Sequence, residues 1–365
     1  MVIRLVDALT DPFVGRLVDQ RSSPRNLQNW SIASAILMTL SYTALINPPD
    51  LLITETQILT YMALLTLVVS VSTGALNVTV QAWPIRWTKK TKEQSDLVGR
   101  REQFTLIGVV IASTLSTTYN STFFTIYLSI TAFITCLFLN SLPNIGASIN
   151  KARNNSWKLS ERYILLFIPL FVSSLANAIA ATVFIFFVTD FLGFSQSEGG
   201  SMLGVYFVSA LIGVWVWKKI ISTSNLMTIY LVSLLLTVAA FIPTLWLDQS
   251  VAYLFLPICI ITGVLLGAEL ILPSLILIRQ LMESGDSERS GMVFGTWSLL
   301  VKLALAAAAG MALPVLGLLG YQPNETMGHY AVPLVYVVVP VCLKIITIAL
   351  FYAYQNKISL HSATR

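Results

Sequence analysis

Long apolar runs recur along the whole of this chain and leave few ways for it to fold. Hydrophobic residues make up 56% of its 365 residues and charged residues only 11%, whereas a water-soluble domain carries about 25% charged residues. Inside a bilayer the backbone must satisfy its own hydrogen bonds, and a run of about 20 apolar residues does so as an α-helix. The composition therefore predicts an all-α, polytopic membrane protein.

Eleven runs are long enough to be membrane-spanning helices, and the breaks between them carry turn-forming residues. The longest polar connection, at 141–160, separates five runs from six. We therefore expect an N-terminal helical bundle at 1–140, a cytoplasmic connecting loop at 141–160, and a C-terminal six-helix bundle with a short tail at 161–365. The predicted spans are 2–18, 29–47, 57–83, 103–118, 122–140, 161–189, 200–217, 226–246, 252–280, 291–319 and 331–353.

Lysines and arginines fall almost entirely in alternate connections between these spans. The connections at 48–56, 119–121, 190–199, 247–251 and 320–330 contain no Lys or Arg, and they hold acidic residues instead. The positive-inside rule then places the odd-numbered connections and the C-terminus in the cytoplasm. The net charge of +5 is thus explained by topology in a plasma (inner) membrane, and we expect no nucleic-acid partner.

Residues for metal or nucleophilic chemistry are scarce. The three cysteines are far apart in apolar segments, and the two histidines lie at a loop edge and in the tail. No His/Cys cluster or nucleophile motif supports an enzyme. We expect no enzymatic activity, no resident cofactor, and no metal beyond a coupling Na⁺.

Three ionisable side chains interrupt the first apolar run. Asp7 and Asp11 are four residues apart and share one helix face, and Arg4 joins them from one turn earlier. A charge inside a membrane costs roughly 3 kcal/mol and usually marks an ion or substrate pathway. We interpret the two aspartates as a cation site for Na⁺ or H⁺; the alternative is that Arg4 neutralises one of them in a structural ion pair.

Charged and aromatic residues of the later spans are further candidates. Glu269 and Lys302 lie deep in separate apolar runs, so each is either functional or part of a mutual structural pair. Lys344 lies nearer the end of the last predicted span, where we expect it to reach the interface. Trp83 and Trp297 either stack on a sugar or anchor their helices at the interface.

Several motifs resemble one transporter family, and their order follows it along essentially the whole chain. The segment Asp7-Ala-Leu-Thr-Asp11-Pro12, followed by Gly15 and Asp19, resembles the second helix of the glycoside–pentoside–hexuronide:cation symporters. This is the branch of the major facilitator superfamily that contains melibiose permease. Later matches are Arg101-Glu102, Gly267-Ala-Glu269, Glu288-Arg-Ser-Gly291 with Trp297 and Lys302, and Gly320-Tyr-Gln-Pro-Asn324.

The resemblance implies a fold of two helical bundles around a central cavity, with alternating access. About 11 of the family's twelve helices are present, because the match begins at the second helix; a start upstream of Met1 or a truncation would explain this. It also implies a cation site at Asp7, Asp11 and Thr10. Substrate contacts implied by the resemblance and by position are Arg4, Arg101, Lys302, Trp83, Trp297 and Glu269.

Two further features bear on conformation and substrate. Gly15, Asp19 and Arg21, with Arg16 and Arg25 nearby, resemble the short cytoplasmic loop motif that latches the two bundles; the alternative is a solvated turn. Thr79 stands where melibiose permease has a sugar-binding aspartate, so the resemblance leaves the solute open.

Our leading hypothesis is a monomeric secondary transporter that couples Na⁺ or H⁺ to the uptake of a small polar solute, such as a sugar or glycoside. The alternatives are a lysolipid or amphiphile carrier on the same fold and a truncated membrane protein that does not transport.

Overall fold

In the computed structural model the chain is helical nearly throughout the residues that it describes, which are 2–20, 24–49, 54–118, 121–141, 159–221, 225–322 and 330–363. The α-helices are α1 (Val2–Asp19), α2 (Pro24–Ile46), α3 (Glu55–Trp87), α4 (Thr91–Thr118), α5 (Ser121–Ser141), α6 (Glu161–Phe186), α7 (Gln196–Ile221), α8 (Leu226–Phe241), α9 (Phe255–Glu283), α10 (Ser290–Leu318), α11 (Ala331–Pro333) and α12 (Val339–Ala363). Short 3₁₀- or π-helical segments extend or connect them: η1 (Phe187–Phe191), η2 (Ile242–Trp246), η3 (Ala252–Leu254), η4 (Ser287–Arg289) and η5 (Leu334–Val338).

All eleven predicted spans lie on these elements, so the helical fold predicted from the apolar runs is confirmed. Among the described residues, eight helices are long and apolar enough to cross a membrane. The other three predicted spans lie on α1, α4 and α5. Of these, α1 contains the charged residues Arg4, Asp7 and Asp11. The apolar part of α5, Thr125–Ser141, is shorter than the other apolar helices.

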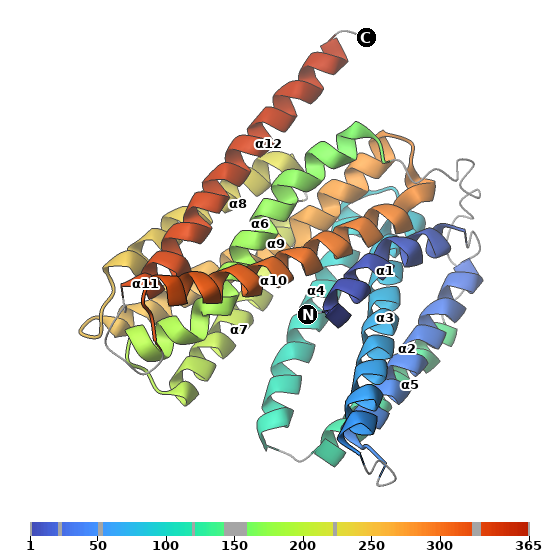
Figure 1. The fold of residues 1–365 in the computed structure, drawn as a ribbon. Coiled ribbons are helices and arrows are strands. Elements are labelled where there is room, and N and C mark those ends of the chain that lie inside the picture. The colour runs from blue at the N-terminus through green and yellow to red at the C-terminus, as the bar shows by residue number, and fades with distance from the viewer. Residues whose placement is uncertain are drawn as a thin grey trace. The chain divides into compact units, whose positions relative to one another are not determined.

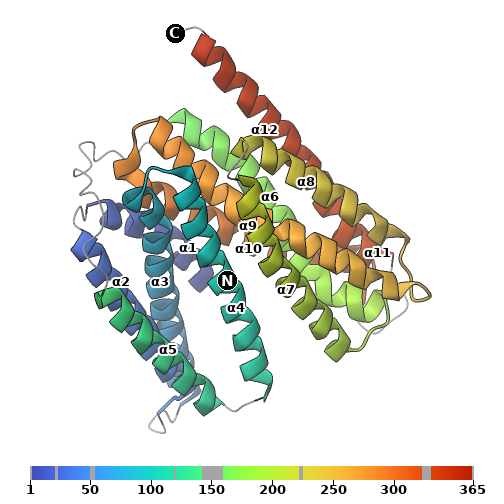
Figure 2. The ribbon, with the colours of Figure 1, turned by 180° about the vertical axis from the view of Figure 1, so that it is seen from behind.

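The chain divides into two compact units. The first unit comprises Met1–Val98, Gly108–Asn155 and Leu277–Lys302, and the second comprises Gly99–Ile107, Ser156–Ile276 and Leu303–Arg365. In the first unit α3 packs against α1 and α2, and α2 also packs against α5, as Figures 1 and 2 show. In the second unit α12 packs along α6 and α8.

Side-chain caps explain where α3 and α8 begin. Thr54 and Gln57 form a reciprocal capping pair at the start of α3: the Thr54 hydroxyl accepts from the Gln57 amide at 3.3 Å, and the Gln57 side chain accepts from the Thr54 amide at 3.2 Å. Asn225 caps α8 by accepting from the Met227 amide at 3.1 Å. These caps satisfy amides that the first helical turn leaves without partners.

An aromatic cluster fills one end of the second unit. Phe187 of the π-helical η1 stacks on Tyr336 of the π-helical η5, with ring centroids 4.3 Å apart. Phe255 of α9 packs against Phe187 at 5.4 Å, and all three side chains are buried. The cluster fixes α6 and α12 to α9 at this end, while the polar contacts described below join the same helices farther along.

Candidate functional site

Two aspartates of α1 share a lysine of α10. The Lys302 ammonium lies 2.8 Å from Asp7 Oδ1, and it lies 3.0 and 2.8 Å from Asp11 Oδ1 and Oδ2. All three residues belong to the first unit. The Asp11 side chain is 1% exposed and that of Lys302 24%. The predicted stacking of the two carboxylates on one face is therefore seen, and together with Lys302 they carry a formal charge of −1.

A glycine of α3 makes room for this site. A Cβ atom on Gly74 would lie 2.4 Å from Asp11 Oδ1 and 3.2 Å from Lys302 Nζ. Real Cβ atoms do not approach other atoms to 2.4 Å, so any side chain at this position would displace the carboxylate. The sequence analysis missed Gly74, because a glycine in a transmembrane helix is common and nothing local ties it to α1.

Thr10 and Arg4 were also predicted for this site. The Thr10 hydroxyl donates to the main-chain oxygen of Asp7 at 2.7 Å, so its proton is engaged within α1. Its role as a cation ligand stays a prediction. The Arg4 side chain lies outside the described residues, and so does the suggested ion pair between it and an aspartate. The described neutralising partner of both aspartates is Lys302.

The end of α1 meets the beginning of α10. Asp19 accepts hydrogen bonds from the main-chain amides of Gly291 at 2.6 Å and Met292 at 2.8 Å, and Arg86 Nη2 lies 3.3 Å from Asp19 Oδ1. A carboxylate at a helix N-terminus is stabilised by the unsatisfied amides and by the helix dipole. Asp19 is buried, so the alternative of a solvated turn is wrong for this residue.

Close backbone contact supports the same junction. A Cβ on Gly15 would lie 2.1 Å from the main-chain oxygen of Gly291, so α1 and α10 approach one another only because both positions are glycine. Arg21, predicted as part of the latch, lies outside the described residues. The described basic residue that contacts Asp19 is Arg86, which the sequence analysis did not name as a site residue.

The residues predicted to contact substrate elsewhere are held by neighbours on their own units. In the second unit Arg101 donates to Glu102 Oε1 through Nε at 3.0 Å and to Ser274 Oγ at 3.2 Å. In the first unit Trp83 stacks on Trp87 with ring centroids 5.4 Å apart, and Trp297 is 8% exposed. Their substrate roles stay predictions.

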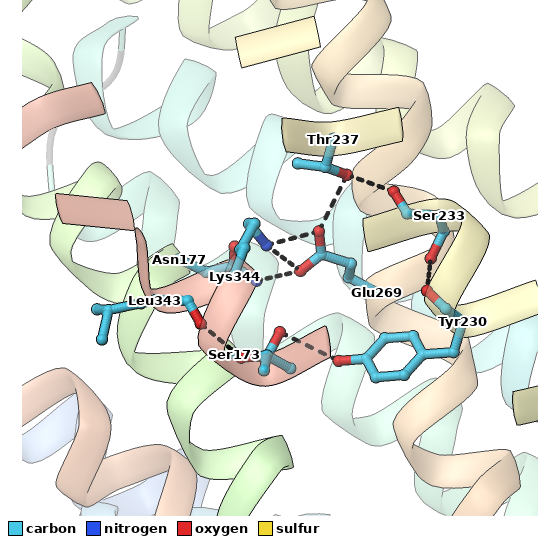
Figure 3. A network of polar contacts seen from close by, with 9 residues as sticks. Ser173, Asn177, Tyr230, Ser233, Thr237, Glu269, Leu343 and Lys344 are labelled. Atoms are coloured by element: carbon cyan, nitrogen blue, oxygen red, sulfur yellow. Dashed lines mark hydrogen bonds and ion pairs between the residues drawn. The ribbon is translucent and has the colours of Figure 1, made fainter. Parts of the chain in front are cut away.

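Glu269 has a partner other than the one considered from the sequence. The ammonium of Lys344 lies 2.7 Å from both carboxylate oxygens of Glu269, within the second unit (Figure 3). The suggested pair of Glu269 with Lys302 is therefore wrong, since Lys302 binds the aspartates. The expectation that Lys344 reaches the interface is also wrong: its side chain is 6% exposed and lies midway along the apolar span Ala331–Lys357.

Two neutral side chains complete the surroundings of Glu269. Asn177 of α6 donates to Oε2 at 2.7 Å, and Thr237 of α8 lies 3.3 Å from Oε1. In Figure 3 the contacts continue from Thr237 to Ser233, and Tyr230 on the same helix donates to Ser173 of α6 at 3.1 Å. The sequence analysis missed Asn177 and Thr237. The sequence of one helix does not indicate which of its polar residues lies beside a charged residue of another helix.

The described geometry also bears on metal binding. Among the described residues no group of three or more His, Cys, Asp or Glu side chains gathers as metal ligands. The carboxylates of Asp7, Asp11 and Glu269 are each in contact with a lysine ammonium.

Solved structures with similar folds are membrane transporters. A bacterial homologue of the iron transporter ferroportin, in an outward-facing state, is 15% identical with a TM-score of 0.69; the match covers 97% of this chain and 89% of that one. The human organic anion transporter TETRAN is 14% identical with a TM-score of 0.69, over 97% and 81%. The Escherichia coli fucose:proton symporter FucP is 11% identical with a TM-score of 0.65, over 96% and 93%. At these identities the likeness shows the fold alone.

A family model described as MFS/sugar transport protein matches residues 1–142 and 156–356, which is most of the sequence. The chain belongs to that family. With eight helices among the described residues that are long and apolar enough to cross a membrane, it is an integral, multi-pass membrane transporter of the major facilitator superfamily and not an enzyme. No curated protein matches the chain.

Proposed function

We propose that the protein is a cation-coupled symporter of the melibiose-permease-like branch. In this proposal Na⁺ or H⁺ binds at Asp7 and Asp11 and drives the uptake of a small polar solute, a sugar or glycoside, by alternating access. The observation that carries the proposal is the position of Lys302, whose ammonium lies within 3.0 Å of both aspartates.

The charges at this site favour an exchange of contacts when one further cation binds. Two carboxylates around one ammonium leave a formal charge of −1, which one monovalent ion beside Lys302 neutralises. The incoming ion and Lys302 compete for the same oxygens, because Asp11 turns both of its oxygens toward the ammonium. Binding of the ion therefore loosens the contacts of Lys302 with α1 while the ammonium stays at the site. An ammonium has three hydrogens, and those that the loosened contacts free can bind solute oxygens.

This exchange supplies a physical basis for coupling. Coupling requires that the ion and the solute each favour the state that the other favours. If Lys302 binds solute only when the ion occupies the aspartates, each ligand strengthens the binding of the other. Arg101 and the rings of Trp83 and Trp297 are further proposed solute contacts, on the basis of residue type and family resemblance.

The α1–α10 junction fits the proposed latch. Asp19 accepts from two amides at the N-terminus of α10 and also pairs with Arg86 of α3, and Lys302 lies three turns farther along α10. Because α10 carries both the capped end and the lysine, movement of α10 relative to α1 would break the latch and the ion site together. We propose that these contacts hold one conformation of the transport cycle.

The family and the fold support transport of this kind without naming the ion or solute. The family description includes sugar transport, and one structure of the same fold is a fucose:proton symporter. We propose further that the protein resides in the plasma membrane as a monomer, with its C-terminus in the cytoplasm as the charge pattern predicts.

The test is uptake of a panel of labelled sugars and glycosides into proteoliposomes, with Na⁺ and H⁺ gradients imposed separately. Asp7→Asn and Asp11→Asn should abolish gradient-driven uptake, whereas Asp248→Asn, at an exposed turn between α8 and α9, should leave it unchanged. Undiminished gradient-driven uptake in both aspartate variants would refute the assignment.

A further inference from the structure

The second unit contains a buried acidic group that the proposed mechanism does not use. Glu269 of α9 is surrounded by α6, α8 and α12, and its side chain is 4% exposed. The Lys344 ammonium lies symmetrically between its two oxygens, at 2.7 Å from each (Figure 3). Asn177 and Thr237 approach the same carboxylate. An ammonium in this position does what a bound monovalent cation would do.

The acidic sites at Asp7 and Asp11 and at Glu269 differ in their ratio of charges. In the first unit two carboxylates share one ammonium, and the Lys302 side chain is 24% exposed. In the second unit one carboxylate has one ammonium, and the Lys344 side chain is 6% exposed. Among the described side chains, the first site keeps one negative charge more than its ammonium balances, and its lysine is partly exposed. The second is neutral, with both carboxylate oxygens occupied.

We propose that Lys344 is a tethered cation that permanently fills an acidic site in the second unit. Without it, Glu269 would bind a mobile monovalent cation, H⁺ or Na⁺. Lys344 is then a specificity residue, because it confines ion binding to Asp7 and Asp11. This role in ion selection rests on the proposed function above. The filling of the Glu269 site does not depend on it.

The physical reason is desolvation. A carboxylate this deeply buried is stable as an anion only beside a positive charge, and otherwise it takes up a proton. Removing one partner of a buried ion pair leaves an uncompensated charge, whereas removing both leaves none. Replacing Lys344 alone and replacing it together with Glu269 should therefore have opposite consequences.

The experiment uses the full-length purified protein with Asp7→Asn and Asp11→Asn already present, so that the first site does not contribute. Lys344→Met is compared with Glu269→Gln/Lys344→Met, which keeps similar volumes and removes both charges. Thermal unfolding is followed from about pH 5 to about pH 8 in choline chloride, and then at fixed pH in NaCl. Infrared spectra report the carbonyl stretch of a protonated carboxyl group.

We expect K344M to lose stability as the pH rises, because the folded protein holds a proton on Glu269 that the unfolded chain has released above about pH 4.3. One proton of difference changes the unfolding equilibrium up to tenfold per pH unit. The infrared band should appear in K344M and be absent with Lys344 intact and in E269Q/K344M. Stabilisation of K344M by NaCl, lost in the double variant, would identify Na⁺ as the ion taken up.

Other outcomes also decide the question. If K344M fails to fold at every pH and Na⁺ concentration tested while E269Q/K344M folds, Glu269 has taken up neither ion, the pair is a structural ion pair, and the proposal is overturned. If K344M folds with neither the infrared band nor any response to pH or Na⁺, the proposal is overturned. It is also overturned if E269Q/K344M fails to fold, because the network would then be needed for its hydrogen bonds and not for filling a cation site. Uptake by the Asp7 and Asp11 variants, with Lys344 intact, tests the proposed function separately.

Discussion

Replacement of Asp11 by asparagine tests the proposed cation site most directly, because it removes one charge with almost no change in volume. The Asp11 side chain is 1% exposed, and both of its oxygens lie within 3.0 Å of the Lys302 ammonium. Asparagine keeps one oxygen as a hydrogen-bond acceptor. The formal charge of the site changes from −1 to 0, so the site no longer has a charge for an incoming cation to neutralise.

The expected loss of cation binding in Asp11→Asn follows from the distance between the cation and the carboxylate and from the exposure of the site. Two unit charges about 4 Å apart attract by about 4 kcal/mol at an effective dielectric constant of about 20. The site is not fully buried, since the Asp7 and Lys302 side chains are 14% and 24% exposed. We therefore expect a loss of about 3 kcal/mol in cation binding, which is roughly a hundredfold in the dissociation constant.

Cation-dependent stabilisation of the purified protein is the assay. At a cation concentration of about one hundred times the dissociation constant, the unsubstituted protein should gain about 2.7 kcal/mol. At the same concentration Asp11→Asn should gain only about 0.4 kcal/mol, because the concentration then only equals the dissociation constant. The assay compares NaCl with choline chloride, and compares pH values in the absence of Na⁺.

Asp19→Asn is the matched control, since Asp19 is a buried carboxylate on the same helix but outside the ion site. It should lower the baseline stability and leave the cation-dependent gain unchanged. If Asp11→Asn kept the full gain while Asp19→Asn lost it, the ion would bind at the α1–α10 junction, and the reasoning from Asp7, Asp11 and Lys302 would be wrong.

Three further substitutions test the surroundings of these sites. Gly74→Ala places a methyl group 2.4 Å from an oxygen of the buried aspartate and should abolish the cation-dependent gain, whereas Gly108→Ala, with no atom within 4 Å, should not; equal gains in both would contradict the packing argument. Gly15→Ala pushes a methyl group into the backbone of α10 and should cost at least about 1–3 kcal/mol in the free energy of unfolding, measured by denaturation. Arg86→Gln leaves the buried carboxylate at the end of α1 without its guanidinium and should cost about 3–5 kcal/mol, and an unchanged melting temperature would show that the two amides suffice.

The helices could be predicted because each apolar run carries its own signal. All eleven predicted spans lie on helical elements, and their ends differ where polar residues extend a helix beyond its apolar part. The last span illustrates the consequence. It was predicted to end at residue 353, but α12 continues to Ala363. Lys344 therefore lies deeper than its distance from the predicted end suggested, and this made its predicted position at the interface wrong.

The partners of the charged residues could not be predicted, because pairing depends on how distant helices face one another. Asp7 and Asp11 stand out locally as charges in an apolar helix, and their spacing places them on one face. Their lysine is 295 and 291 residues away, and nothing in either helix specifies the other. The same limit applies to Glu269, for which Lys302 was considered and Lys344 was found.

The number of positive partners at each buried acid separates structural charges from exchangeable ones. Glu269 has its own ammonium and two neutral neighbours, and Asp19 has a guanidinium and two helix amides. Among the buried acids whose surroundings the structure describes, Asp7 and Asp11 together exceed their described cation by one charge. Since a buried unmatched charge is the costly arrangement, the acidic pair of α1 is where an arriving cation gains most. The charge count of each cluster, more than its depth in the membrane, is thus the basis on which we propose Asp7 and Asp11 as the carboxylates of ion coupling.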